Sequence, residues 1–183
     1  MMKSKLLLIS LSSLLVGGCV YVGPIEEEVD SLPYFNEFTG VNPSMGFVEV
    51  DLSSGGTQEF TLKDYGDDNE YQTLYHRMVV DYRAAGLTSN PISAVSPKAI
   101  EPGRRESIYY TFPACSLPKP YSDVLVDGKT IDLYLILSDD EFSYQNQNPT
   151  QSFSDFSFPF ETVSGRGGVW VHWTVRFTGS CHP

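Results

Sequence analysis

The sequence predicts an all-β fold, an antiparallel β-sandwich formed by residues 46–183. Three observations predict it. Polar and apolar side chains alternate with a period of two in several segments, and glycine, proline and aspartate turn signals separate those segments. Sustained helical periodicity is absent beyond the N-terminal 18 residues. Strands without intervening helices cannot build βαβ units, so we expect antiparallel sheets, with a closed barrel as the alternative.

An export signal precedes this domain. Lys3 and Lys5 lead into an apolar run over residues 6–16, and Gly17-Gly18-Cys19 follows. A basic head, a short apolar run and a small-residue cleavage site make a secretory signal. A membrane-spanning helix would need about 20 apolar residues. We therefore expect residues 1–18 to be a signal peptide.

The residues Val16-Gly17-Gly18-Cys19 resemble the lipobox of bacterial lipoprotein precursors. The resemblance implies a diacylglycerol group on the Cys19 sulfur and cleavage before Cys19. In similar lipoproteins of diderm bacteria, Asp after the modified cysteine retains the protein at the inner membrane. Val20 stands there in this chain, which favours the outer membrane, at the periplasmic face or the cell surface. The lipid on Cys19 would make the membrane contact.

Residues 19–45 are expected to be a flexible tether that carries the lipidated cysteine. This segment has little periodic pattern, and Glu26-Glu27-Glu28 adds a like-charge run that is typical of a solvated chain. We expect ordered structure to begin near Tyr34-Phe35.

Six strands are predicted in the domain, from their alternation and composition. They cover residues 47–52, 57–62, 73–82, 106–112, 130–137 and 169–177. The turn at residues 53–56 predicts that the first two form a hairpin. The side chains expected to share core-facing sides of the last four strands are Leu74, His76, Met78, Val80, Tyr82, Ile108, Tyr110, Phe112, Ile131, Leu133, Leu135, Leu137, Val169, Val171, Trp173, Val175 and Phe177.

Two cysteines remain if Cys19 carries lipid. An exported chain meets an oxidising compartment, so Cys115 and Cys181 are expected to form a disulfide bond. The alternative is a reactive or metal-binding thiol, with His182 beside Cys181. Six or seven strands, one buried tryptophan and a disulfide between the sheets favour an immunoglobulin-like sandwich.

Residues 60–70 and 74–81 resemble part of an immunoglobulin-like repeat of the PKD or cadherin type, in which an Asp/Gly-rich turn leads into an aromatic strand. Met78 stands where those modules carry tryptophan. The resemblance implies the sandwich fold and a spacer, adhesin or binding role.

The acidic turn in this stretch is a candidate calcium site. Asp64, Asp67, Asp68, Asn69 and Glu70 offer the oxygen ligands that Ca²⁺ takes. A second acidic group at residues 139–141 could complete the site if the fold brings the loops together. The alternative is a pair of solvated turns, because Asp and Asn are good turn formers.

Residues 139–168 form a long segment without clear strand periodicity, in which aromatic side chains stand among Ser, Asn and Gln. Phe142, Tyr144, Phe153 and Phe156 are candidates for a partner-binding surface, since aromatic rings bury much area for few rotatable bonds. The alternative is that Phe153, Phe156 and Phe160 belong to a short strand or flap that covers the sheet.

The composition excludes some classes of function. Lys3 and Lys5 would leave with the signal, so 10 basic and 23 acidic side chains remain, a formal charge of −13. A nucleic-acid partner is therefore not expected, because its phosphates need Lys and Arg. The sequence carries no recognised nucleophile, metalloprotease or phosphate-binding motif, so no catalytic residue is predicted.

The sequence therefore predicts a lipid-anchored envelope protein whose sandwich domain is a non-catalytic binding or structural module with an envelope protein partner. A calcium-dependent adhesion or spacer module is one alternative, and a hydrolase that uses clustered carboxylates is another. No cofactor is expected other than a candidate Ca²⁺ ion.

Overall fold

The computed structural model describes residues 31–87, 92–93, 98–103, 106–142 and 168–181. Within them the chain is mostly β-strand, so the predicted all-β class is confirmed. No helix of these residues is long and apolar enough to cross a membrane. The elements in chain order are β1 (Tyr34–Phe35), β2 (Val41–Asn42), β3 (Gly46–Asp51), η1 (Leu52–Ser54), β4 (Thr57–Leu62), β5 (Tyr65–Gly66), β6 (Leu74–Asp81), η2 (Arg83–Ala85), β7 (Ile92–Ser93), β8 (Lys98–Ile100), β9 (Ile108–Pro113), η3 (Ala114–Ser116), α1 (Tyr121–Val124), β10 (Thr130–Ser138) and β11 (Val169–Thr178).

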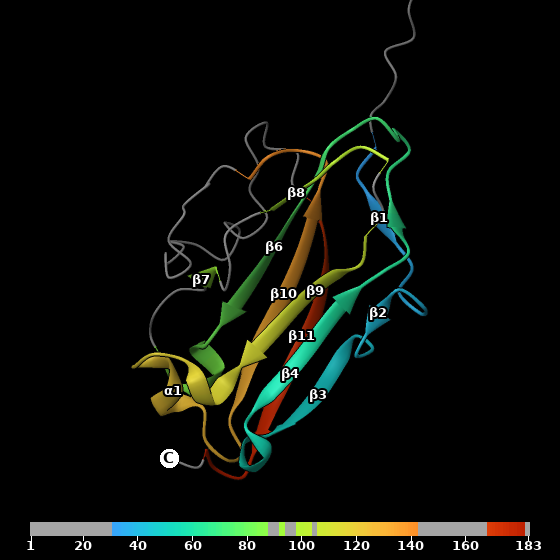
Figure 1. Ribbon diagram of the computed structural model, residues 1–183. Helices are drawn as coiled ribbons and strands as arrows, with labels where there is room; N and C mark the ends of the chain where they lie inside the picture. The colour runs from blue at the N-terminus through green and yellow to red at the C-terminus, as the bar shows by residue number, and fades with distance from the viewer. Residues whose placement is uncertain (1–30, 88–91, 94–97, 104–105, 143–167, 182–183) are drawn as a thin grey trace, which may run out of the picture.

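Two sheets face each other across the core. The larger has the strand order β3-β11-β10-β6-β7, with β8 also paired to β6, and the smaller has the order β2-β4-β9. Figure 1 shows β4 and β9 in front of the larger sheet, and the short β1-β5 pair at one end. Aromatic rings meet between the layers: the ring centroids of Phe60 of β4 and Trp173 of β11 lie 4.8 Å apart.

Alternation in the sequence decides which side chains enter this core, because successive side chains of a strand point to opposite faces. The predicted inner faces of β6, β9, β10 and β11 are confirmed. All of their apolar members except the partly buried Val169 are buried, and Trp173 is fully buried. His76 also points inward, where its ring lies 5.6 Å from that of Tyr110.

The predicted hairpin between the first two strands is wrong. Strand β3 pairs with β11 in the larger sheet, whereas β4 pairs with β9 and β2 in the smaller sheet. The connection crosses between sheets through η1, where Asp51 Oδ1 accepts the Ser53 N–H at 2.8 Å. Gly55 and Gly56 follow with φ of 101° and 61°, which glycine adopts at little cost. A turn between two alternating segments does not by itself distinguish a hairpin from such an arch.

The expectation of purely antiparallel sheets is wrong at one pair. Strands β3 and β11 run parallel, from Gly46 opposite Trp173 to Asp51 opposite Thr178. The argument from missing crossover helices applies to parallel strands joined directly to each other. In chain order, β3 is the first strand of its sheet and β11 is the last. The segment that connects them therefore contains all the other strands of that sheet.

The folded part begins earlier than the predicted boundary at residue 45. Strands β1 and β2 lie inside the predicted tether, Val41 is buried, and Pro43 O accepts the indole N–H of Trp173 at 2.8 Å. The start near Tyr34-Phe35 agrees with β1. The predicted signal peptide, Cys19 and residues 20–30 lie outside the described residues.

The predicted disulfide bond between Cys115 and Cys181 is confirmed, with Cα atoms 5.5 Å apart. Cys115 lies in η3, directly after β9 of the smaller sheet, and Cys181 follows β11 of the larger sheet. The bond therefore ties the two layers together at the end where the chain terminus lies (Figure 1).

Candidate functional site

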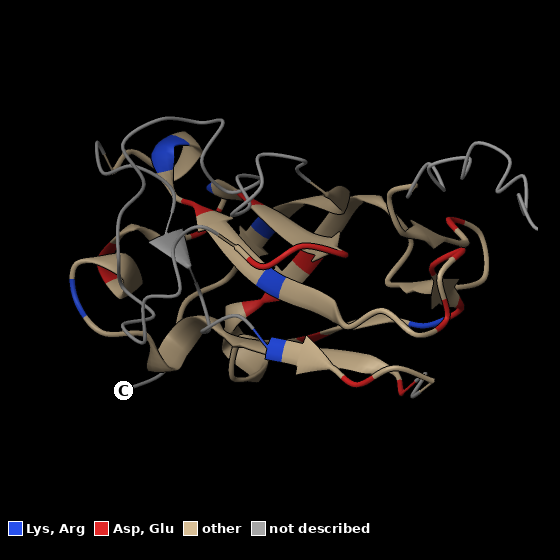
Figure 2. Cartoon of the chain, turned by 90° about the horizontal axis from the view of Figure 1, so that it is seen from above, with Lys and Arg blue, Asp and Glu red and all other residues tan. Residues whose placement is uncertain are grey.

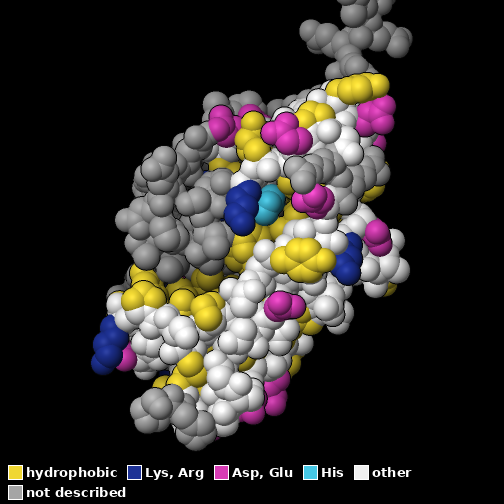
Figure 3. Space-filling model, in the orientation of Figure 1, with side chains coloured by type: hydrophobic (Ala, Val, Ile, Leu, Met, Phe, Trp, Pro, Cys, Tyr) yellow, Lys and Arg dark blue, Asp and Glu magenta, His cyan; other side chains and the backbone are white. Residues whose placement is uncertain are grey.

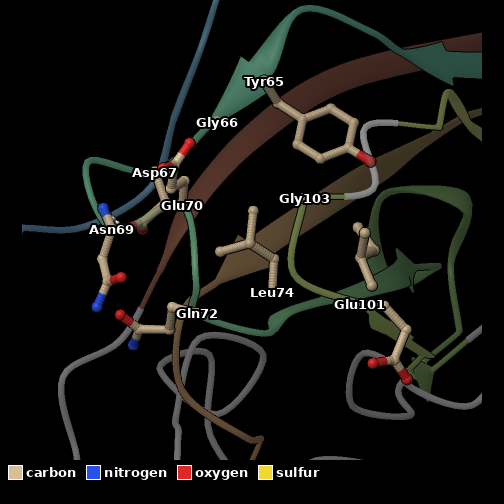
Figure 4. Close-up of a pocket in the computed structure, with 10 residues that line it drawn as sticks. Tyr65, Gly66, Asp67, Asn69, Glu70, Gln72, Leu74, Glu101 and Gly103 are labelled. Atoms are coloured by element: carbon tan, nitrogen blue, oxygen red, sulfur yellow. Dashed lines mark hydrogen bonds between the residues drawn. The ribbon is translucent and has the colours of Figure 1, made fainter.

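A cleft with two lobes opens where the β5–β6 loop, β8 and the start of β9 meet. The first lobe has a volume of about 180 Å³, and the second of about 250 Å³. Tyr65, Ile100 and Glu101 line both lobes, so the two are adjacent. Figure 4 shows Leu74 between the loop that carries Asp67, Asn69 and Glu70 and the segment that carries Glu101 and Gly103.

The first lobe has a buried floor and an acidic rim. Tyr65, Asp67 and Leu74 are buried, and Glu70 and Glu101 are exposed. Within the described residues, no Lys or Arg lines this lobe. The cartoon in Figure 2 shows acidic positions along the loops near β1 and β5. The described residues that line the lobe therefore carry a net negative charge.

Asp67 carries an unmet hydrogen-bonding atom in this lobe. Its side chain is 7% exposed, and its Oδ1 accepts the backbone N–H of Asn69 at 2.8 Å. Its Oδ2 is buried and has no hydrogen-bond partner. Buried polar atoms nearly always have a partner in a folded protein. Asp67 therefore gives the lining of this lobe a buried acceptor without a donor.

A buried, neutral histidine lines the second lobe. His76 is 7% exposed, and its Nδ1 lies 2.6 Å from the Tyr110 hydroxyl. Burial, and then the Lys98 ammonium, lower the pKa of His76 to about 4. Lys98 stands opposite His76 in the β6–β8 pair. In Figure 3 a histidine side chain is visible beside a basic side chain in a hollow of this face.

Tyr65 lines both lobes and is held by a hydrogen bond. Its hydroxyl donates to the backbone carbonyl of Glu106, just before β9. This bond connects β5 to the segment before β9 of the smaller sheet, whereas His76 and Lys98 in the lining belong to the larger sheet. The second lobe is completed by the exposed Glu106, by Ser107 and by the apolar Ile100 and Ile108.

The structure separates the four predicted calcium ligands. Asp67 and Glu70 line the first lobe. Asp64 Oδ2 accepts the Thr39 hydroxyl at 3.2 Å, and Asp68 Oδ2 accepts the Ser31 hydroxyl at 2.6 Å. Among the residues that the structure describes, no three His, Cys, Asp or Glu side chains lie close enough to hold a metal ion.

The second acidic group does approach the same loop. Gln72 Nε2 donates to the backbone carbonyl of Asp139 at 3.1 Å, and Asp139 is 5% exposed. The fold therefore joins the two acidic loops through a side chain of one and the backbone of the other.

Phe142 cannot be part of a partner-binding surface as predicted, because its side chain is fully buried. It packs with Val79, Tyr134 and Ile136 in a second apolar cluster, outside the main core, and the Arg77 guanidinium lies 4.5 Å from its ring centroid. Phe142 therefore covers the outer face of the larger sheet. Tyr144, Phe153 and Phe156 lie outside the described residues.

The other two histidines are separate from the cleft. On the outer face of the larger sheet, His172 Nε2 lies 2.8 Å from Asp132 Oδ1, which also accepts the Thr174 hydroxyl at 2.9 Å. The imidazole stacks on the Tyr134 ring at 4.7 Å. His182 lies outside the described residues.

Sequence reasoning missed most of the cleft. Lys98, Glu101 and Glu106 belong to none of the motifs considered, and Tyr65 lies in the stretch of residues 60–70 but was not identified as a site residue. The only local signal was Glu101-Pro102-Gly103, in which a Pro-Gly turn follows an acidic residue.

Comparison with known proteins adds little to this geometry. No family model matches the chain, and no curated protein matches it. A solved structure titled "Crystal structure of AsqI with Zn" is similar at 11% sequence identity, with a TM-score of 0.32. The match covers 67% of this chain and 32% of that chain, about a third of its length. A likeness this weak carries no argument about fold or function.

Proposed function

We propose that the protein is a lipid-anchored lipoprotein of the bacterial envelope, with an immunoglobulin-like sandwich as a non-catalytic binding module. The observation that carries the proposal is Cys19, placed directly after a basic head, an apolar run and two glycines. The disulfide bond between Cys115 and Cys181 supports export, because structural disulfides form in oxidising compartments. The cleft supports a binding role, because it gathers polar side chains from both layers.

The anchor would keep the cleft near the membrane. Eleven residues separate Cys19 from Ser31, so even a fully extended tether reaches only about 40 Å. The described chain begins next to β1, at the end that also carries β5 and the first lobe (Figure 1). An envelope partner that reaches the cleft would therefore approach within tens of ångströms of the lipid surface.

Replacement of the anchor residue tests this proposal. The native protein should fractionate with membranes, and mass spectrometry should find acyl chains on an N-terminal Cys19. The Cys19→Ser variant should lose the acyl mass and leave the detergent-soluble membrane fraction. Cys115→Ser is the matched control, because it removes a cysteine and should leave the acylation unchanged. An unacylated Cys19 in the native protein would contradict the proposal.

A calcium-dependent adhesion module is the second candidate. The observation in its favour is that Asp67, with an unpartnered Oδ2, shares the first lobe with Glu70. Calorimetric titration with Ca²⁺ and with Mg²⁺ tests it. Heat with Ca²⁺ alone that is lost in Asp67→Asn favours this candidate, and a flat titration at millimolar Ca²⁺ removes it.

A further inference from the structure

We propose that the cleft receives a lysine or arginine side chain of an extended peptide segment in a partner protein, with the cationic group in the first lobe. This inference deepens the binding role proposed above and does not depend on the lipid anchor. It rests on three features of the cleft: the sign of its charge, the unmet acceptor in its wall, and the two sheet edges that border it.

The charge of the cleft differs between its lobes. Asp67, Glu70 and Glu101 line the first lobe, and no basic residue of the described chain stands with them. The second lobe holds the Lys98 ammonium beside a histidine that is neutral at pH 7. Glu101 and Glu106 also line the second lobe, so its acidic charge is partly offset by Lys98, and a cation is attracted more strongly to the first lobe than to the second. The cleft therefore has a preferred direction for a charged ligand.

One buried acceptor atom of the first lobe also lacks a hydrogen-bond donor. Asp67 is more than nine-tenths buried, and its Oδ2 has no partner although Oδ1 is bonded to Asn69. Such an atom loses its hydration on folding and regains no bond. An ammonium or guanidinium group supplies several N–H donors and the opposite charge in one ligand. This second feature distinguishes the lobe from a solvated acidic turn.

An extended peptide is favoured as the carrier of the cation by the strands that border the cleft. Within the described residues, β9 is the last strand of the smaller sheet, and β8 pairs with β6 alone. The second lobe lies between residues 98–101, which include all of β8, and residues 106–108, at the start of β9. An exposed sheet edge offers backbone donors and acceptors to an added strand, and pockets beside it select side chains.

The direct test is a titration of the purified full-length protein in detergent with three capped tripeptides. The first is acetyl-Gly-Lys-Gly-amide, and the other two carry Gln or Glu in place of Lys. The ring signals of ¹³C-labelled histidine report binding, since His76 lines the cleft and His172 does not. Only the lysine peptide should shift the His76 signal at low salt, and 0.5 M NaCl should weaken it severalfold. Equal shifts with the Gln peptide, or no shift at 10 mM lysine peptide, would overturn the proposal.

Paired variants locate the site. Glu70→Gln with Glu101→Gln should weaken the lysine peptide about tenfold at low salt, because two rim charges are lost. Glu49→Gln with Glu59→Gln removes the same charge from exposed positions on β3 and β4 and should change the affinity less than twofold. Asp67→Asn, in which the amide oxygen can still accept from Asn69, should also weaken binding. Equal effects of the two double variants would place the cation elsewhere and overturn the proposal.

Two further arms identify the occupant. Butylamine that binds as tightly as the lysine peptide would overturn the role of the peptide backbone, whereas weaker binding of the free amine supports it.

Arg104 and Arg105 join Gly103 to Glu106 and lie outside the described residues. If the native protein binds nothing and Arg104→Gln with Arg105→Gln binds the lysine peptide, the chain fills its own cleft and the partner is excluded. The acyl-mass measurement on Cys19 is independent of every arm, so failure here leaves the anchor proposal standing.

Discussion

The two ends of the molecule are built in opposite ways. At the closed end, the Cys115–Cys181 bond joins the sheets, and Leu52 and Ala114 fill the space around it with less than 2% exposure. At the open end, the cleft separates the β5–β6 loop from β8 and leaves Asp67 with an unmet acceptor. Apolar and covalent contacts stabilise one end, whereas the other end holds polar groups around a cleft. If stability is concentrated at the closed end, substitutions there should cost more than substitutions around the cleft.

Loss of the disulfide bond should have the largest effect. Cys115→Ala with Cys181→Ala opens a loop of 66 residues and should lower the free energy of unfolding by about 4 kcal/mol, chiefly by increasing the entropy of the unfolded chain. Urea denaturation of the native and double-variant proteins measures it. A loss below about 1 kcal/mol would mean that the closed end is not held by this bond.

Protonation of His76 should give the largest effect at the open end. Burial lowers the folded-state pKa of His76 from 6.5 to about 4, so the folded protein favours the neutral ring. This contribution to stability is fully present above pH 6.5 and is lost as the pH falls from 6.5 through 4. The loss near pH 4 should be about 3 kcal/mol.

Urea denaturation at pH 7 and pH 4 measures this loss against His76→Gln, which keeps a polar partner for Tyr110 and does not titrate. The variant should lose less stability than the native protein over this range, because all other titrating groups are shared. An equal loss of stability in the two proteins would mean that protonation of His76 does not destabilise the fold.

The core was predictable from the sequence, whereas the pairing of β3 and the composition of the cleft were not. Alternation alone placed Leu133, Val175 and Trp173 inside, because burial follows the pleat of each strand whatever its partner. The partners of β3 and β4 were not predictable, because both segments alternate and the turn between them suits a hairpin or an arch. Their pairing is decided by contacts with β9 and β11, which lie far along the chain.

The same reason limited the prediction of the site. Asp67 and Glu70 were identified because they are neighbours in the sequence, and both do line the cleft. Lys98 and Glu101 reach it only because β8 pairs with β6, a contact that no local pattern encodes. Phe142 was wrongly predicted to be exposed, because the residues that it packs against, Arg77 and Val79, lie on a strand more than sixty residues earlier.

A methyl group at Gly56 should test the packing of the closed end. Gly56 has a φ of 61°, and an added Cβ would lie 2.8 Å from Cys115 Sγ and 3.1 Å from Leu52 Cδ2. Gly56→Ala should lower the free energy of unfolding by about 2 kcal/mol, from backbone strain and overpacking. Gly55→Ala is the control, because its φ is 101° and nothing lies within 4 Å of the added Cβ. If the two variants lose equal stability in thermal denaturation, strain alone is responsible and the closed end is not tightly packed.

The smallest expected effect is at the hydrogen bond that shapes the cleft. Tyr65→Phe removes the donor to the Glu106 carbonyl and keeps the ring, so the free energy of unfolding should fall by about 1 kcal/mol. Urea denaturation of the variant and of Tyr109→Phe, an exposed tyrosine on β9, measures the loss and its control. A loss above about 2 kcal/mol would mean that the open end is as tightly coupled as the closed end. A loss of about 1 kcal/mol, with weaker binding of the lysine peptide, would mean that this bond positions the start of β9 for a ligand more than it stabilises the fold.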